Sequence, residues 1–125
     1  MRVVLQGVSR AEVRIDGESV GRIARGFLVL AGFHASDGDE PLRWMAAKIA
    51  SLRLFPDDEG RMNRSIDELN PPGGLLVVSQ FTLYGDAQKG RRPSFVGAAQ
   101  PESAERVYEG FVEVWREGPL GRGEA

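Results

Sequence analysis

Three side chains that can form hydrogen bonds, Ser79, Gln80 and Thr82, directly follow the apolar run 75–78. A short apolar run after two glycines predicts a strand that is buried on both faces. Polar groups at the end of such a strand need partners, because burying them unpaired costs free energy. If the partner is the fold, Ser79 and Thr82 cap the next turn, which is the commoner case. If it is a substrate, these groups could hold a carbonyl and its developing oxyanion.

A basic segment lies close behind this cluster and contains Lys89, Arg91 and Arg92. Three basic residues in a loop are most often a solvated surface. As a functional patch they suit one or two phosphate groups, and Arg61 and Arg64 would add to it if the fold brought them near. The net charge of −2 argues against a broad phosphate-binding face, so any nucleic-acid contact should be local and DNA binding is not expected.

The remaining reactive side chains are few. The chain has no cysteine, which excludes disulfides, thiol nucleophiles and thiolate metal sites. Its single histidine, His34, is the only imidazole available as a general base or metal ligand, and a structural role for it is the commoner case. The acidic residues 57–59 lack the spacing of a calcium loop and are typical of a solvated turn. No metal or cofactor site is therefore expected.

The composition indicates one globular domain that spans residues 1–125. Apolar residues make up 42% of the chain and charged residues 27%, which are ordinary values for a soluble protein. No segment has the apolar length of a membrane span, and the first residues do not resemble a signal peptide. We therefore expect a cytoplasmic protein without a membrane partner.

Periodicity predicts four strands in the first part of the chain, over residues 2–8, 11–15, 19–23 and 27–33. Asp16 and Gly17 form a strong hairpin signal between the second and third of them. Consecutive strands with short connections predict a meander in which each strand pairs with the next. The last of the four is apolar throughout and should be buried.

Two amphipathic helices are predicted. The first follows residues 36–41, with Asp39 as a plausible N-cap. Its apolar stripe consists of Leu42, Met45, Ala46, Ile49 and Leu52. The second begins at Pro101 and ends at Gly118 and Pro119, a typical helix stop. Its stripe consists of Ala104, Val107, Tyr108, Phe111, Val112 and Trp115.

Taken together, residues 1–116 resemble the D-aminoacyl-tRNA deacylase family, also called D-tyrosyl-tRNA deacylases. The most specific match is the Ser-Gln-Phe-Thr-Leu segment at 79–83. Supporting matches are Val-Ser-Arg-Ala at 8–11, Gly-Arg-Met-Asn at 60–63 and Gly-Arg-Arg-Pro-Ser-Phe at 90–95. Several motifs in the same order make the resemblance far more specific than one pentapeptide would.

The resemblance implies a fold of the mixed α/β (α+β-like) class. It would have a mostly antiparallel, barrel-like sheet and two main helices in a single domain. It also implies a homodimer that hydrolyses the ester between a D-amino acid and the 3′ end of tRNA as translation quality control. Glycyl-tRNA mischarged on tRNA-Ala is a further substrate that the family suggests. No cofactor or metal is implied.

The resemblance also implies roles for individual residues. Thr82, Gln80 and Phe81 would be catalytic. Substrate or adenosine binding would fall to a larger set that overlaps with them: Ser79, Gln80, Phe81, Met62, Pro93 and Phe95. Lys89, Arg91 and Arg92 would contact RNA phosphates.

The family suggests two mechanisms for the chemical step. The backbone N–H groups near Phe81 and Thr82 would donate to the oxyanion in either case. Thr82 is one candidate nucleophile, while the alternative uses a positioned water and the ribose hydroxyl of the tRNA. The second fits this sequence better, because only His34 could serve Thr82 as a base.

Two departures from the family pattern concern the selection of D-substrates. Family members continue into a strand with a Gly-Pro-Val-Thr motif, whose cis Gly-Pro enters the partner's site and excludes L-amino acids. This sequence stops at Ala125, and its Gly118 and Pro119 follow the last helix directly. Gly7 stands where the family usually has an arginine that supports the Gly-Pro element.

These departures lead to expectations about activity and about stability. Rejection of L-amino acids should be impaired, or the protein should be a catalytically impaired dimeric tRNA-end or nucleoside-binding paralogue. A truncated product without a selected function is a third possibility. Loss of a strand also exposes a sheet edge, so we expect lower stability or a dimer that covers the edge.

Overall fold

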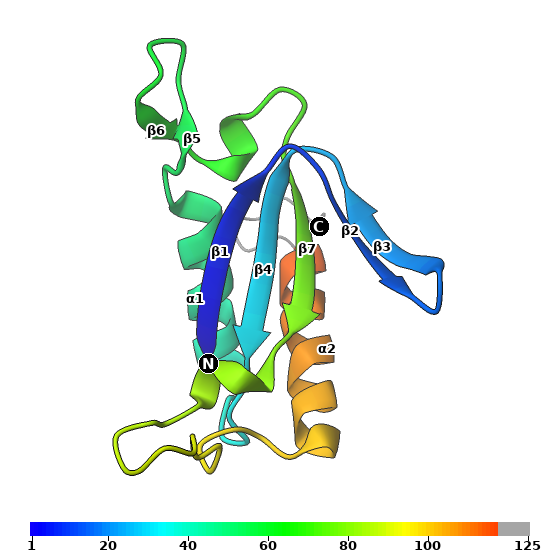
Figure 1. Cartoon of the computed structure of the whole chain (residues 1–125). Helices are drawn as coiled ribbons and strands as arrows, with labels where there is room; N and C mark the ends of the chain where they lie inside the picture. Colours follow the sequence, from blue (N-terminus) through cyan, green and yellow to red (C-terminus); the bar gives the residue numbers. More distant parts are fainter. Residues whose placement is uncertain (118–125) are drawn as a thin grey trace.

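The computed structural model describes residues 1–117, and their centre is a three-stranded mixed sheet. Its strands are β1 (Arg2–Val8), β4 (Gly26–Gly32) and β7 (Gly74–Ser79), in the order β1-β4-β7. β4 pairs with β1 antiparallel and with β7 parallel. Helices α1 (Asp39–Ser51) and α2 (Pro101–Glu117) cover one face of this sheet (Figure 1). The predicted mixed α/β class with two main helices is confirmed.

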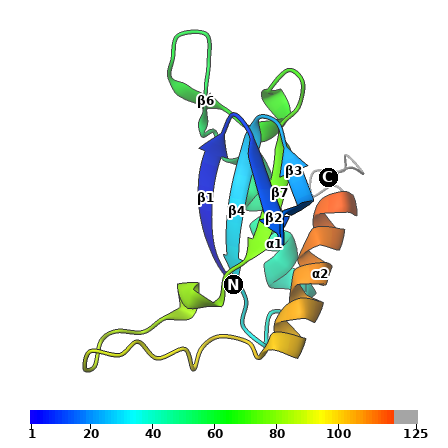
Figure 2. The same ribbon diagram turned by 45° about the vertical axis from the view of Figure 1, so that its right-hand side comes forward.

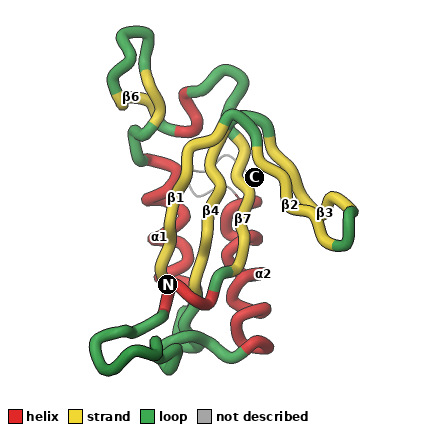
Figure 3. The backbone as a smooth tube through the Cα atoms, in the orientation of Figure 1, coloured by secondary structure: helices red, strands yellow, loops and turns green. Residues whose placement is uncertain are grey.

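Short elements complete the described chain. They are the hairpin of β2 (Ala11–Ile15) and β3 (Glu18–Ile23), the small hairpin of β5 (Phe55–Pro56) and β6 (Met62–Arg64), and the 3₁₀ turns η1 (Ile66–Glu68) and η2 (Phe81–Tyr84). Figure 3 shows that the β5–β6 hairpin and the long loop after η2 lie at opposite ends of the sheet. No helix among residues 1–117 is long and apolar enough to cross a membrane.

The predicted meander is wrong in its pairing. β1 pairs with β4 along its whole length, from Arg2 opposite Gly32 to Val8 opposite Gly26. The β2–β3 hairpin therefore leaves the sheet and forms a sheet of its own (Figure 2). The turn at Asp16 and Gly17, both with positive φ, is the predicted tight turn. Local alternation thus identifies the hairpin, while the partner of β1 depends on contacts distant in sequence.

The strands form three separate hydrogen-bonded sheets within residues 1–117, and β3 of the hairpin lies close to β7 without pairing with it. A Cβ added at Gly21 would lie 3.0 Å from Leu76 Cδ1, and one at Gly74 would lie 3.0 Å from Ile23 Cγ2. The two glycines therefore allow the hairpin to pack closely over β7.

The core lies between the sheet and the two helices. It contains Phe27, Val29 and Ala31 from β4, which are at most 1% exposed, together with apolar residues of both helices. The predicted stripes are confirmed at Leu42, Ala46 and Ile49 of α1 and at Phe111 and Trp115 of α2. Burial of these side chains is the main favourable contribution to folding.

Two local predictions need correction. Gly38 is the N-cap of α1, and no side chain caps this helix. Asp39 instead accepts a 2.8 Å hydrogen bond from Arg43 Nε one turn later, a pairing typical of exposed helix faces. The run 75–78 is only half-buried, because β7 is an edge strand and the helices cover one of its faces.

Candidate active site

The site begins where β7 ends. The Gln80 N–H donates to the Ala31 carbonyl at 2.8 Å, which extends the pairing with β4 one residue beyond β7. The chain then turns through η2, where the Leu83 N–H bonds to Gln80 O at 3.3 Å and the Gly85 N–H to Thr82 O at 3.0 Å. The first amides of a helical turn have no partner inside it. Accordingly, the N–H groups of Phe81 and Thr82 donate to no acceptor among residues 1–117.

The side chains of Gln80 and Thr82 are paired with each other. Gln80 Nε2 donates to Thr82 Oγ1, and both groups are close to the solvent. Within the described residues, Thr82 has no hydrogen bond to a carboxylate or an imidazole. His34 Nδ1 lies instead 2.7 Å from Ser36 Oγ and accepts from the Ser36 N–H at 3.1 Å. No general base for Thr82 is therefore present in this part of the chain.

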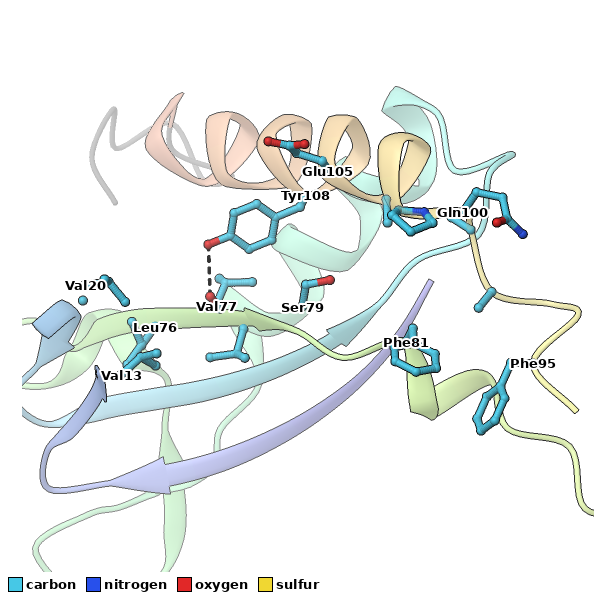
Figure 4. Close-up of a pocket in the computed structure, with 16 residues that line it drawn as sticks. Val13, Val20, Leu76, Val77, Ser79, Phe81, Phe95, Gln100, Glu105 and Tyr108 are labelled. Carbon is cyan, nitrogen blue, oxygen red and sulfur yellow. Dashed lines mark hydrogen bonds between the residues drawn. The ribbon is translucent and has the colours of Figure 1, made fainter. Parts of the chain in front are cut away.

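A cavity of about 700 Å³ lies beside the end of β7. Its walls are the free edge of β7, the β2–β3 hairpin, the start of α2 and the loop before it (Figure 4). The lining is mainly apolar and includes Leu76, Ser79, Phe81 and Phe95. Of the predicted site residues, the structure thus brings Ser79, Phe81 and Phe95 together around one cavity. Gln80 and Thr82 adjoin them in the chain but do not line it.

Two aromatic rings lie at the mouth of the cavity. Phe81 and Phe95 contact each other edge-to-face, with ring centroids 5.3 Å apart, and are 57% and 36% exposed. Asp86 and Ser94 exchange two 2.7 Å backbone hydrogen bonds, which close the loop between them. The bridge brings Phe95, the next residue, close to Phe81. Exposed aromatic faces of this kind are suited to stacking on a nucleobase.

The predicted phosphate contacts lie on the same closed loop. Lys89, Arg91 and Arg92 are exposed near its tip, where Gly90 adopts a φ of +69°. None of the three forms an ion pair with residues 1–117, so their charges are available to a ligand. Pro93 is also exposed on this loop and does not line the cavity.

Met62 is placed far from this cluster. It is 73% exposed on the β5–β6 hairpin, at the opposite end of the sheet from η2 (Figure 3). Arg61 and Arg64 lie on the same hairpin and pair with Glu59 and Asp58, so they do not add to the basic loop. One subunit therefore does not bring the 60–63 and 79–83 motifs together.

The acidic turn beside Met62 has a structural explanation. Asp57 Oδ1 accepts hydrogen bonds from the Arg61 N–H at 3.0 Å and the Glu59 N–H at 2.9 Å. These bonds, that from Arg61 above all, hold the pKa of Asp57 below its ordinary value. No group of three or more acidic, histidine or cysteine side chains among residues 1–117 is arranged to hold a metal ion.

Sequence reasoning placed Tyr108 on the core stripe of α2 and missed its second role. Its ring lines the cavity, and its hydroxyl donates to Val77 O at 3.1 Å (Figure 4). The N–H groups of Gly74 and Gln80 point to β4. Because successive residues of a strand direct their backbone groups to opposite sides, the N–H and C=O groups of the odd-numbered residues of β7, Val77 among them, point to its free edge. Tyr108 therefore satisfies an edge carbonyl. The only signal in the sequence was one hydroxyl on an otherwise apolar stripe.

Gly118 and Pro119, the candidate equivalent of the Gly-Pro element, lie outside the described residues. Gly7 lies within β1, and the nearest atom to a Cβ added there would be Phe55 Cε1 at 3.8 Å. Position 7 therefore has room for the first atom of a side chain.

Comparison with known proteins identifies the family. The sequence profile of the D-Tyr-tRNA(Tyr) deacylase family matches residues 4–122. A D-aminoacyl-tRNA deacylase of Desulfatibacillum aliphaticivorans is 56% identical over 114 residues, which cover 91% of this chain and 77% of that protein. One of Chloroherpeton thalassium is 53% identical, over 91% of this chain and 74% of that protein.

Two solved structures share the fold. A protein described as c-Myc DNA Unwinding Element Binding Protein superposes with a TM-score of 0.84 and 37% identity, over 97% of this chain and 80% of that one. A probable eukaryotic D-amino acid tRNA deacylase superposes with a TM-score of 0.76 and 24% identity, over 94% of this chain and 67% of that one. At this level of identity, the second match supports the fold alone. Because the profile match spans nearly the whole chain and the relatives are more than half identical, this chain belongs to the D-Tyr-tRNA(Tyr) deacylase family.

Proposed function

We propose that this protein hydrolyses the ester bond between a D-amino acid and the 3′-terminal adenosine of tRNA. The observation that carries the proposal is the pair of backbone N–H groups of Phe81 and Thr82, which have no acceptor among residues 1–117 and lie beside an aromatic-lined cavity. The curated relatives described above are named D-aminoacyl-tRNA deacylases, which supports the same reaction class. Hydrolysis releases a free D-amino acid and an uncharged tRNA. Such an enzyme would work in the cytoplasm and needs no cofactor.

In the proposed reaction, the aromatic rings bind the substrate and the two backbone amides stabilise the oxyanion. The terminal adenine stacks on Phe81 and Phe95, which places the ester carbonyl near the two amides. A water molecule attacks the carbonyl carbon, the amides stabilise the oxyanion, and the ester C–O bond breaks. The attacking water gives up one proton, and the ribose oxygen leaves as a hydroxyl group that carries it. Loss of one oxyanion donor typically lowers kcat about 10²- to 10³-fold.

Thr82 acts in this scheme by position and not as a nucleophile. Its hydroxyl accepts a hydrogen bond from Gln80, and no base among residues 1–117 contacts it. A serine or threonine nucleophile needs such a base. The Gln80–Thr82 pair instead braces the turn that carries the two amides, and Ser79 adds a hydroxyl to the cavity wall.

Lys89, Arg91 and Arg92 contact the phosphates near the 3′ end of the tRNA in this proposal. Replacing all three with alanine should raise KM and weaken its dependence on salt, since each phosphate contact releases counterions. A matched control replaces three exposed basic residues of the helices, Arg43, Lys48 and Arg116, with alanine. Equal effects of the two triple variants would contradict a specific phosphate site.

We also propose that the protein acts as a homodimer. Even-numbered residues of the sheet face away from the helices, and Val4, Leu28 and Leu30 form an apolar surface there. Val4 is 47% exposed. A second copy would cover this apolar surface. A substrate-binding role for Met62 would require the partner's copy, because β6, which carries Met62, is remote from η2 in its own subunit.

The direct test is deacylation of matched D- and L-tyrosyl-tRNA by the full chain. The proposal predicts hydrolysis of the D-ester, with kcat lowered but not abolished in both Gln80→Ala and Thr82→Ala, because each variant removes the same hydrogen bond that braces the turn. The ratio of the two substrates' rates measures how well the protein selects by handedness. Adenosine binding without hydrolysis of either ester would overturn the proposal and favour a nucleoside-binding protein.

A further inference from the structure

Arg2, the first residue of β1, connects that strand to the turn η2. Its Nη1 donates to the Leu83 carbonyl at 3.1 Å, and its guanidinium carbon lies 4.7 Å from the centroid of the Tyr84 ring. Leu83 and Tyr84 are the last two residues of η2. One side chain therefore holds both the backbone and an aromatic ring at the end of this turn.

Gly32 supports the turn from the other side. It is the register partner of Arg2 in the β1–β4 pair. A Cβ added at Gly32 would lie 3.1 Å from each of three atoms of this segment, namely Gln80 O, Leu83 Cβ and Tyr84 Cδ2. The turn thus rests directly on the backbone of β4, with Arg2 reaching over it from the neighbouring strand.

The turn is short, with four residues from Phe81 to Tyr84, so its ends depend on contacts with the rest of the fold. At its ends, the Leu83 N–H bonds to Gln80 O and the Gly85 N–H bonds to Thr82 O. The last carbonyls of a helical turn lack internal donors, and a cation near them is favourable. A guanidinium provides both a charged donor and a planar face for an aromatic ring, which an ammonium does not.

The start of β1 is itself fixed. The Met1 amino group forms a 3.0 Å ion pair with Asp37 Oδ1, and both groups are almost fully buried. Asp37 Oδ2 also accepts the His34 N–H at 2.7 Å. The backbone of Arg2 therefore begins from an anchored point, which limits how far its side chain can shift.

From this geometry we infer that Arg2 is a positioning residue for the deacylation reaction, acting through η2 to aim the Phe81 and Thr82 amides at the ester carbonyl. The inference rests on the proposed function. Arg2 contacts the far end of the turn and not the cavity. Its effect should therefore appear mainly in the transition state, where alignment with the oxyanion matters most.

The test compares Arg2→Ala, Arg2→Lys and the control Arg43→Ala in steady-state deacylation of D-tyrosyl-tRNA. Arg43 is also exposed and also forms two side-chain hydrogen bonds, to Asp39 and Glu117 on the helices. We expect Arg2→Ala to lower kcat roughly 10- to 100-fold with a smaller change in KM, as for misaligned catalytic groups. Arg2→Lys should recover part of the loss, because it keeps the donor. Arg43→Ala should match the wild type.

Amide hydrogen exchange gives a readout that does not depend on activity. Exchange at Leu83 and Gly85 should accelerate in Arg2→Ala, less in Arg2→Lys, and not in Arg43→Ala. Gly32→Ala should displace the turn from the other side and produce the same pattern. An inactive wild type would overturn the proposed function. In that case the exchange data would still test whether Arg2 holds η2 in place. An active wild type with unchanged kcat in Arg2→Ala would overturn the inference.

Discussion

β4 and β7 have similar sequences but occupy different environments. Each is an apolar run that begins at a glycine, and each seemed from sequence to be a fully buried strand. In the structure, β4 lies between two strands and is the most buried strand, whereas β7 has a free edge and stays half-buried. Position in the sheet, and not apolarity, therefore decides which strand belongs to the core and which lines the cavity.

The ends of the two strands differ for the same reason. β4 continues into Phe33, which is 2% exposed and packs in the core. β7 ends at Ser79 and continues into Gln80 and η2, which adjoin the cavity. Polar side chains with open donors are tolerated there because solvent or a ligand can satisfy them. The comparison predicts that substitutions in β4 affect stability and that substitutions near the end of β7 affect function.

The largest expected effect is loss of stability in Phe27→Ala. Phe27 is 1% exposed, and its ring lies 4.7 Å from that of Phe55, between centroids. Removing a buried phenylalanine typically lowers the free energy of unfolding by about 3–5 kcal/mol. Urea unfolding monitored by circular dichroism measures this loss. The paired variant Leu76→Ala in β7 should lose less than half as much, and equal losses would contradict the distinction between the strands.

Phe95→Ala should weaken substrate binding while leaving the fold intact. Stacking of a base on an aromatic ring contributes about 1–3 kcal/mol, so KM should rise by roughly 5- to 100-fold. Its neighbour Val96 is 92% exposed and does not line the cavity, which makes Val96→Ala a matched control. Steady-state kinetics measure the effect. An unchanged KM in Phe95→Ala would remove the aromatic pair from the binding site.

Tyr108→Phe should lower the free energy of unfolding by a smaller amount, which measures the hydrogen bond at the free edge of β7. The substitution keeps the ring, which contacts Phe33 edge-to-face, but removes the hydrogen bond to Val77 O. Loss of one such bond typically costs about 0.5–1.5 kcal/mol. Phe33→Leu would instead disturb the core and should cost more. A neutral Tyr108→Phe variant would show that water satisfies the edge carbonyl equally well.

The smallest expected effect is a pH dependence from Tyr84. Burial raises the pKa of Tyr84, and the nearby charge of Asp37 raises it further. The unfolded chain therefore releases this proton at a lower pH than the folded chain does. Stability from this source is present below the unfolded pKa, near 10, and is lost as the pH rises toward the folded value. Tyr84→Phe should show a weaker loss between pH 9 and 11; identical curves would contradict this assignment.

Much of the fold follows from local pattern. The turn at Asp16 and Gly17, the stripes of both helices and the buried strand at 27–33 were all predicted and are confirmed. The N-cap of α1 was misassigned, because Asp39 bonds to Arg43 instead. The partner of β1 was also wrong, since pairing with β4 skips the hairpin between them. Neither error changes the fold class.

The candidate site was predictable in part. The segment 79–82 and Phe95 were singled out from sequence, and the structure places them beside one cavity. Tyr108 and Arg2 were missed as parts of this region, because their contacts join residues 31 and 81 positions apart. Met62 was assigned to the same site from the family motif, but it lies on β6, at the other end of the sheet (Figure 3).

The sequence by itself determined the helices, the hairpin, the polar cluster after β7 and the family. These features depend on neighbours within a few residues, or on motifs that can be read along the chain. Only the tertiary structure decided that β7 is an edge strand, that its end opens on a cavity and that Arg2 and Gly32 hold η2 between them. Long-range pairing sets these properties, and one-dimensional periodicity carries no information about which distant strands meet.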